Sequence, residues 1–344
     1  MRPLRGALLL WLGLSLSACV PAPQVFDPAL IPPAADLGVK NAATEWWYVS
    51  GYLAESGVAF HWAQFKVNYR GLPYHAGHVA LTDLRGDQLA LSENSSQNAR
   101  FGFMPLRVQQ GDWALREDAQ GRYHLGAGPL NLVLTPLKGP VVHPPGYSGT
   151  PEVGRLYYQS VTRLAASGTV RIGGQARQVS GVVWLDHQWG DQQSGREALW
   201  DWFGLHLSDG SDLMLYRIRR ANGEVVQVRG SRVDPAGAAH PVPDLVMTPG
   251  REWTSPSGRR YVLDWQVSGQ GLDLRLAAVR DGQELLTKTT SVAYWEGPVR
   301  GEGHLGGVAV SAEGMGEFIG GVLRPDEGGL VPSLPAPTIP GNAL

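Results

Sequence analysis

The feature that most constrains the fold is an internal repeat of a tryptophan-rich pattern. Residues 46–53 read WWYVSGYL, and 154 residues later residues 200–207 read WDWFGLHL. The following residues match at the same offset: Ala59 with Leu213, Phe60 with Met214, and Trp62 with Tyr216. A strand, an acidic turn and a second strand therefore open both halves of the chain. This order predicts two similar domains that arose by duplication.

The two halves end with a looser match. We align Tyr157 and Tyr158 with Tyr294 and Trp295, and residues 181–183 with residues 316–318, at the cost of a two-residue difference in spacing. Two matches in the same order favour duplication over chance similarity among tryptophan-rich strands. We place the domains at residues 41–195 and 196–330, after a tether at 20–40 and before a Pro-rich tail at 331–344.

Glycine and proline divide both halves into short strand-like runs. The sequence contains 45 Gly and 25 Pro, and β-branched and aromatic residues lie between them. Tight turns between antiparallel strands are predicted at Asp209-Gly210, Asn222-Gly223 and Asp281-Gly282. No segment repeats apolar residues at helical spacing, so few helices are expected. We predict an all-β fold of two lipocalin-like antiparallel β-barrel domains in tandem, with a calyx for one apolar molecule.

The N-terminus predicts export and lipid attachment. Arg2 and Arg5 precede an apolar stretch that is too short to span a bilayer, and LSAC at residues 16–19 resembles a lipobox. Cys19 is the only cysteine, which excludes an internal disulfide and suits a lipidation site. We expect a signal peptide at residues 1–19 and a lipid anchor in the cell envelope, on the periplasmic or extracytoplasmic side. Val20 favours the outer membrane if the cell has two.

Charge and motif content narrow the possible partners. Lys and Arg number 29 against 31 Asp and Glu, and both signs are dispersed, so no basic footprint for nucleic acid exists. His75 and His78 are three residues apart, which places them on opposite faces of a strand and argues against a metal site. The serine elbow G-x-S-x-G is absent. We expect an apolar small-molecule partner, no metal and no cofactor.

Several ordered motifs carry a family resemblance over roughly residues 40–325. They are EWWYVSGYL, FHWAQFKV, YYQSVTRLAASG, GVVWLDHQWG, WDWFGLHLSDGSDLMLY and YWEG. The series resembles the hydroxyneurosporene synthase (carotenoid 1,2-hydratase)/AttH family. That resemblance implies two lipocalin-like domains and, in the hydratases, addition of water to a terminal isoprenoid double bond by an acidic residue near aromatics. Other members are labelled predicted secreted hydrolases or are associated with export-type ABC transporters, so a carrier working with such a transporter and a hydrolase are the alternatives.

The stretch VVWLDHQWG holds the two candidate catalytic residues, Asp186 and His187. Strand alternation places Trp184 and Asp186 on one face and His187 on the other, unless a bulge intervenes. In an apolar surrounding, burial would keep Asp186 protonated, as a general acid for an alkene requires. Trp184 would stabilise the developing cation. In the alternative structural interpretation, Asp186 pairs with a basic residue such as Arg155.

Further ligand-binding candidates lie on the strands that open and close the first half. They are Glu45, Trp47, Tyr48, Gln64, Tyr158 and Trp184. A lumen carboxylate, aromatic walls and a neutral amide that positions water or a carbonyl group would suit an apolar ligand. The sequence leaves open whether the protein is a hydratase-like enzyme, a binding protein or a packed structural lipoprotein. It also leaves open whether Asp186 faces a lumen or the contact between the domains.

Overall fold

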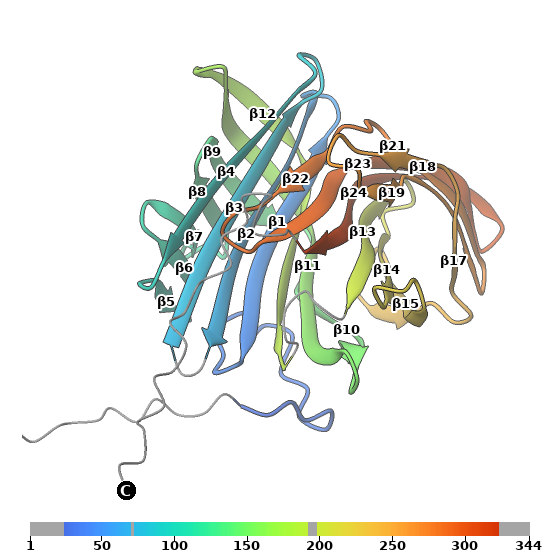
Figure 1. The fold of residues 1–344 in the computed structure, drawn as a ribbon, viewed down its shortest axis with the longest axis horizontal. Helices are drawn as coiled ribbons and strands as arrows, with labels where there is room; N and C mark the ends of the chain where they lie inside the picture. The colour runs from blue at the N-terminus through green and yellow to red at the C-terminus, as the bar shows by residue number, and fades with distance from the viewer. Residues whose placement is uncertain (1–23, 70–71, 192–197, 323–344) are drawn as a thin grey trace, which may run out of the picture.

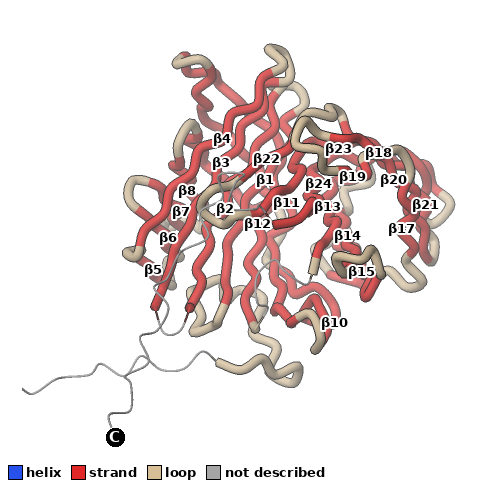
Figure 2. The backbone as a smooth tube through the Cα atoms, in the orientation of Figure 1, coloured by secondary structure: helices blue, strands red, loops and turns tan. Residues whose placement is uncertain are grey.

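The computed structural model describes residues 24–69, 72–191 and 198–322, and in this part of the chain it contains strands and no helix (Figure 2). The predicted all-β class is therefore confirmed. Cys19, the signal peptide and the tail at 331–344 lie outside the described residues. No helix within the described ranges has the length and apolarity to cross a bilayer.

The strands form two curled antiparallel sheets that stand side by side (Figure 1). The first sheet contains β1 (Thr44–Leu53), β2 (Val58–Tyr69), β3 (Leu72–Asp83), β4 (Gln88–Ser96), β5 (Arg100–Gly102), β6 (Arg107–Gln110), β7 (Trp113–Glu117), β8 (Tyr123–Ala127), β9 (Leu130–Pro136), β10 (Val141–Thr150), β11 (Gly154–Ile172) and β12 (Gln175–Gly190).

The second sheet contains β13 (Leu199–Leu207), β14 (Asp212–Arg219), β15 (Val225–Val233), β16 (Ala239–Pro241), β17 (Val246–Pro249), β20 (Asp264–Gly269), β21 (Leu272–Ala278), β22 (Glu284–Leu286), β23 (Val292–Leu305) and β24 (Val308–Val322). A separate hairpin pairs β18 (Glu252–Thr254) with β19 (Arg260–Val262). The turns at Asp209-Gly210 and Asn222-Gly223 connect paired strands. The prediction for Asp281-Gly282 is wrong, because β21 and β22 each pair with β23 instead of with each other.

The sheets repeat one topology, which locates the equivalent residues of the two halves. β1 lies between β12 and β2, as β13 lies between β24 and β14. Tyr48 stands opposite Asp186 in the first sheet, and its repeat partner Trp202 stands opposite Glu317 in the second. Asp186 and Glu317 are therefore equivalent positions. On the next strand Ser160 faces Asp186 as Glu296 faces Glu317.

This register corrects the alignment of the closing segments. Two residues before Ser160 and Glu296 lie Tyr158 and Tyr294, so Tyr158 is the equivalent of Tyr294. The sequence alignment instead placed Tyr157 against Tyr294. It was one residue out, because two adjacent aromatic residues in each half allow either pairing. The match of residues 181–183 with 316–318 is wrong by four residues, because it placed Val182, and not Asp186, against Glu317.

Each sheet encloses an apolar core of its own. In the first, the buried side chains include Trp47, Trp62 and Phe60, and in the second they include Phe203 and Trp295. Complete burial of one large apolar side chain contributes about 1.5–3 kcal/mol, so these residues are a main source of stability. These buried side chains pack against one another inside each sheet.

A third apolar cluster lies where the sheets meet, with β1 and β2 against β23 and β24 (Figure 1). We call this cluster, together with the polar side chains bonded to it, the seam. Its buried apolar members are Tyr48, Tyr52, Ala59, Ala63, Val153, Tyr158, Trp184, Ala198, Trp202, Met214, Tyr216, Ile218 and Met315. Both halves of the repeat contribute to it.

Candidate active site

Strand β12 places Asp186 in the seam and His187 on the opposite face. Its register with β1 and β11 is unbroken from Gly190 to Leu185, so no bulge rotates either side chain. Leu185 belongs to the core of the first sheet, whereas Trp184 belongs to the seam. Asp186 and His187 therefore do not form an acid–base pair, and Asp186 looks into the contact between the sheets.

Asp186 is held by three hydrogen-bond donors. Its Oδ2 accepts from the Tyr158 hydroxyl at 2.7 Å, and its Oδ1 accepts from the Trp184 Nε1–H at 2.5 Å and from the Ser160 hydroxyl. The residue is only 4% exposed. Burial raises the pKa of Asp186 to about 7, although these three hydrogen bonds favour the charged form and lower it.

No basic side chain of the described residues forms an ion pair with Asp186. Arg155, the partner that the sequence suggested, instead contacts Asp191 at the end of the motif. Without a cation to stabilise the carboxylate, Asp186 changes its charge near neutral pH. It can therefore both hold and release a proton there.

Aromatic rings from both sheets surround Asp186. The Trp202 Nε1–H donates to the Tyr158 hydroxyl at 2.7 Å, and the Trp202 ring meets those of Tyr48 and Trp184 edge to face. Gly204 leaves room for this arrangement, because a Cβ there would lie 2.5 Å from the Trp202 ring. The electron-rich faces of such rings stabilise a nearby cation.

A buried histidine links the seam to the second sheet behind Ser160. His143 contacts the Ser160 hydroxyl through Nε2 at 2.7 Å and the Ser231 hydroxyl through Nδ1 at 2.5 Å. Burial lowers the pKa of His143 to about 3, so this imidazole is neutral at pH 7. It positions Ser160, which in turn holds Asp186.

Two further carboxyl groups lie in the second half of the seam. Glu296 and Glu317 stand directly opposite each other on β23 and β24. Burial, and then the charge of Glu317, raise the pKa of Glu296 well above its usual value, and its Oε1 accepts from the Tyr48 hydroxyl at 2.7 Å. Burial raises the pKa of Glu317 to about 7. Two negative charges on these facing, buried carboxyl groups would repel each other, so ionising both is costly. Glu296 and Glu317 therefore tend to retain protons.

The remaining sequence candidates gather elsewhere in the first sheet. Glu45 contacts the Lys66 Nζ and the His187 Nε2, each at 2.9 Å. Trp47 stacks on His187 and donates to the Leu37 carbonyl. Burial lowers the pKa of His187, while the hydrogen bond to Glu45 opposes that effect. These contacts tie the strand ends together on the face opposite the seam.

Gln64 also lies away from Asp186. Its amide donates to the Ala76 carbonyl at 3.1 Å and to the Gln110 side chain. The structure thus brings together Tyr48, Tyr158, Trp184 and Asp186, and separates them from Glu45, Trp47, Gln64 and His187.

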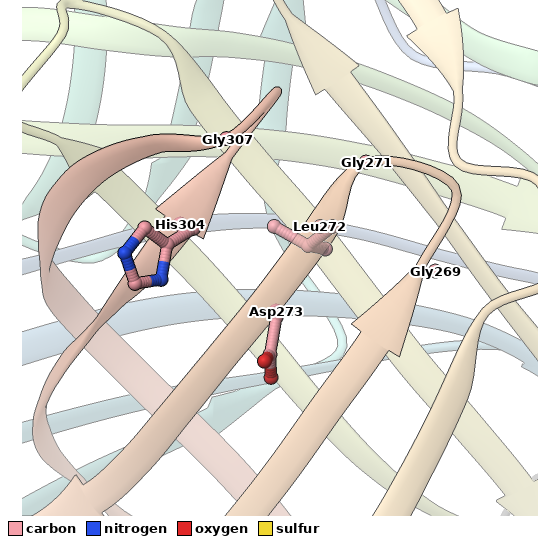
Figure 3. A pocket seen from close by; sticks show the side chains of 6 residues that line it. All are labelled: Gly269, Gly271, Leu272, Asp273, His304 and Gly307. Carbon is pink, nitrogen blue, oxygen red and sulfur yellow. The ribbon is translucent and has the colours of Figure 1, made fainter.

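A shallow depression of about 220 Å³ lies outside the seam (Figure 3). It is formed at the turns of the second sheet by Gly269, Gly271, Leu272, Asp273, His304 and Gly307. Asp273 and His304 are exposed there. Within the described ranges, no three His, Cys, Asp or Glu side chains come together in a way that could hold a metal ion.

Comparison with known proteins assigns the family. The sequence model of the AttH-like family matches residues 27–321. The chain belongs to the AttH-like family. No curated protein sequence matches it. A crystal structure of a protein assigned as an AttH from Nitrosomonas europaea is 26% identical, with a TM-score of 0.76, over 87% of this chain and 100% of that one.

More distant structures share the fold of this AttH-like chain. Kievitone hydratase from Nectria haematococca is 17% identical, with a TM-score of 0.68, over 86% of this chain and 96% of that one. CghA is 11% identical, with a TM-score of 0.58, over 88% and 94% of the two chains. At these identities the likeness concerns the fold alone.

Several residues in and around the seam of this AttH-like chain were not predicted from the sequence. Glu296 lies in the quoted motif YWEG and Trp202 lies in the repeat, but neither was singled out as a site residue. Glu317 could have been found as the equivalent of Asp186 if the second repeat had been aligned by strand register. His143 had no signal, because it is followed by Pro144 and Pro145 in a segment that does not resemble a strand.

Proposed function

We propose that this protein is a hydratase-like enzyme that adds water to, or removes it from, an apolar isoprenoid-type molecule, with Asp186 as the general acid. The observation that carries the proposal is a buried carboxyl with a pKa of about 7, surrounded by aromatic rings and without a basic partner among the described residues. The similarity in fold to kievitone hydratase supports the proposal, since that protein is named as a hydratase and has the same architecture.

The chemistry follows from these surroundings. A protonated Asp186 transfers its proton to one carbon of an electron-rich double bond, and positive charge develops on the other carbon. The faces of Trp184, Trp202 and Tyr48 attract that charge. Hydrogen bonds from Tyr158, Ser160 and Trp184 then stabilise the carboxylate that remains. Each donor is already oriented before the proton leaves, which keeps reorganisation small.

The test is hydration of lycopene, an acyclic isoprenoid that ends in isopropylidene groups, in D₂O. The expected product carries one new hydroxyl and one carbon-bound deuterium for each double bond that reacts, as read by mass spectrometry. Because the acid must be protonated, kcat should fall about tenfold per pH unit above pH 7 and level off below it. The profile is repeated in Glu317→Gln, since Glu317 titrates in the same range. Turnover that rises between pH 6 and 8 would contradict this assignment.

We propose further that the protein acts at the cell envelope, held by a lipid on Cys19. The supporting observation is the lipobox-like sequence at residues 16–19. When the full-length chain is expressed in a bacterium, it is expected to sediment with membranes, and Cys19→Ala is expected to release it into the soluble fraction. Mass spectrometry of the N-terminal peptide should show the lipid, and an unmodified Cys19 would refute the anchor.

A further inference from the structure

We propose that His61 is the proton acceptor of the seam: its Nδ1 binds a hydroxylic group, and a directed relay leads from it to Glu93 at the surface. The inference rests on the proposed function, since water that adds to a cation must lose a proton. The relay consists of His61, Tyr294, His78, Thr289 and Glu93.

The relay is a continuous chain of hydrogen-bonding contacts in which residues of the two halves of the chain alternate. The Tyr294 hydroxyl lies 3.1 Å from the His61 Nε2 and 3.2 Å from the His78 Nδ1. The His78 Nε2 lies 2.7 Å from the Thr289 hydroxyl, which donates to Glu93 at 2.8 Å. Both imidazoles are about 1% exposed, whereas the Glu93 side chain is 15% exposed. The chain therefore connects a buried end with a solvent-accessible one.

The donor and acceptor of every hydrogen bond in the relay follow from the bond at its surface end, between Thr289 and Glu93. Since Thr289 has one hydroxyl proton and gives it to Glu93, the His78 Nε2 must carry a proton and donate to Thr289. Burial lowers the pKa of His78 to about 4 and that of His61 to about 3, so both rings are neutral at pH 7. The His78 Nδ1 then accepts from Tyr294, and Tyr294 accepts from the His61 Nε2–H.

This ordering leaves the His61 Nδ1 with a lone pair. Among the described residues that atom has no hydrogen-bond partner, and neither has the Glu296 Oε2. Both atoms flank one ring, because Tyr48 lies over His61 and its hydroxyl donates to the Glu296 Oε1. Burial raises the pKa of Glu296 well above its usual value and so favours the protonated form, and because Oε1 accepts from Tyr48, a proton on this carboxyl group would reside on Oε2. A hydroxylic group could accept from Glu296 and donate to His61, which would satisfy both buried atoms.

The proton balance of hydration then closes. The π electrons form a C–H bond with the Asp186 proton, and a lone pair of water forms the C–O bond to the cationic carbon. The added water transfers a proton to the His61 Nδ1. The Nε2 proton passes to Tyr294, that of Tyr294 to His78, that of His78 to Thr289, and that of Thr289 to Glu93. Solvent takes the proton from Glu93 and returns one to Asp186 when the product leaves.

The first test reads the tautomers directly and needs no substrate. In nitrogen-15 NMR of the full-length protein labelled on histidine, His61 and His78 should both be neutral at pH 7 with the proton on Nε2. Tyr294→Phe removes one hydroxyl from the relay and should shift the His61 ring signals, whereas Tyr123→Phe, in the core of the first sheet, should not. A proton on the His61 Nδ1 in the wild-type protein would overturn the inference.

The second test is kinetic and uses lycopene as the probe. Glu93→Gln keeps the shape but cannot take up the proton, so kcat should fall about tenfold or more with KM unchanged. The matched control is Asp87→Asn, which also removes a carboxylate that bonds across the sheets, here to Arg280, but lies outside the relay. Full kcat in Glu93→Gln, in an enzyme that Asp186→Asn inactivates, would refute the relay. If Asp186→Asn stayed active, the assignment of Asp186 as the general acid would be wrong. The histidine tautomers measured by NMR would then still decide whether the relay has the proposed direction.

Discussion

Replacement of Asp186 by Asn is expected to lower kcat for lycopene hydration by a factor of about 100 to 10,000, the usual contribution of a general acid. The amide has nearly the shape of the carboxyl but has no acidic proton to give to the alkene. Because the seam keeps its aromatic walls, KM and the affinity measured by tryptophan fluorescence should stay within about threefold of wild type. The urea midpoint should change little, since a neutral side chain already occupies this site below pH 7.

The matched control for this variant is Asp191→Asn. Asp191 follows the same strand five residues later, but it contacts Arg155 at the rim of the sheet instead of entering the seam. Its kcat should equal that of the wild type. An Asp186→Asn variant that retains more than a tenth of wild-type kcat would show that Asp186 is not the proton donor.

Much of the fold could be predicted because it depends on local patterns. Glycine-punctuated runs and the repeat of residues 46–53 at 200–207 predicted two antiparallel β units, and the two sheets have this form. Alternation along VVWLDHQWG also separated Asp186 from His187 correctly, since a strand without a bulge leaves no other arrangement. These features are decided by neighbours within a few residues or by one strand pairing.

The residues that the second sheet contributes to the surroundings of Asp186 could not be predicted in the same way. Glu296, Tyr294 and Trp202 reach the seam because the second sheet packs against the first, and no period in the sequence encodes that packing. Glu45 and Gln64 lie on the face of the first sheet opposite the seam, and their separation from Asp186 could not be predicted for the same reason. A polar residue on a strand of the first sheet can face either the sheet's own interior or the other sheet, and only the packed structure distinguishes the two.

A second large effect is expected at the ionic cluster that joins the sheets around Asp212. Its Oδ2 contacts the Lys138 Nζ at 2.7 Å and accepts from the Thr162 hydroxyl at 2.9 Å. Its Oδ1 lies 2.8 Å from the Arg163 guanidinium and 2.8 Å from the His206 Nδ1. The Asp212 side chain is fully buried and that of Lys138 is 5% exposed, so solvent cannot replace the carboxylate.

Asp212→Asn is therefore expected to lower the free energy of unfolding by about 3–5 kcal/mol at pH 7, the cost of leaving a buried cation without its partner. The measurement is urea unfolding followed by tryptophan fluorescence. Asp234→Asn is the matched control, because Asp234 accepts from His240 in a similar pair at the surface of the same sheet. Exposed pairs contribute little, so that control should stay close to wild type.

The pKa of Asp212 also predicts how the stability difference between wild type and Asp212→Asn changes with pH. Burial alone would raise the pKa of Asp212, but the hydrogen bonds from His206 and Lys138 and the charges of His206 and Arg163 hold it below its usual 3.8. The unfolded chain therefore binds the proton more readily than the folded one, and the stabilisation is present above about pH 4 and lost as the pH falls through the folded value. The gap between wild type and Asp212→Asn should thus be full at pH 7 and shrink below pH 4. A gap that is absent at pH 7, or that widens in acid, would show that the cluster aligns the two sheets without stabilising them.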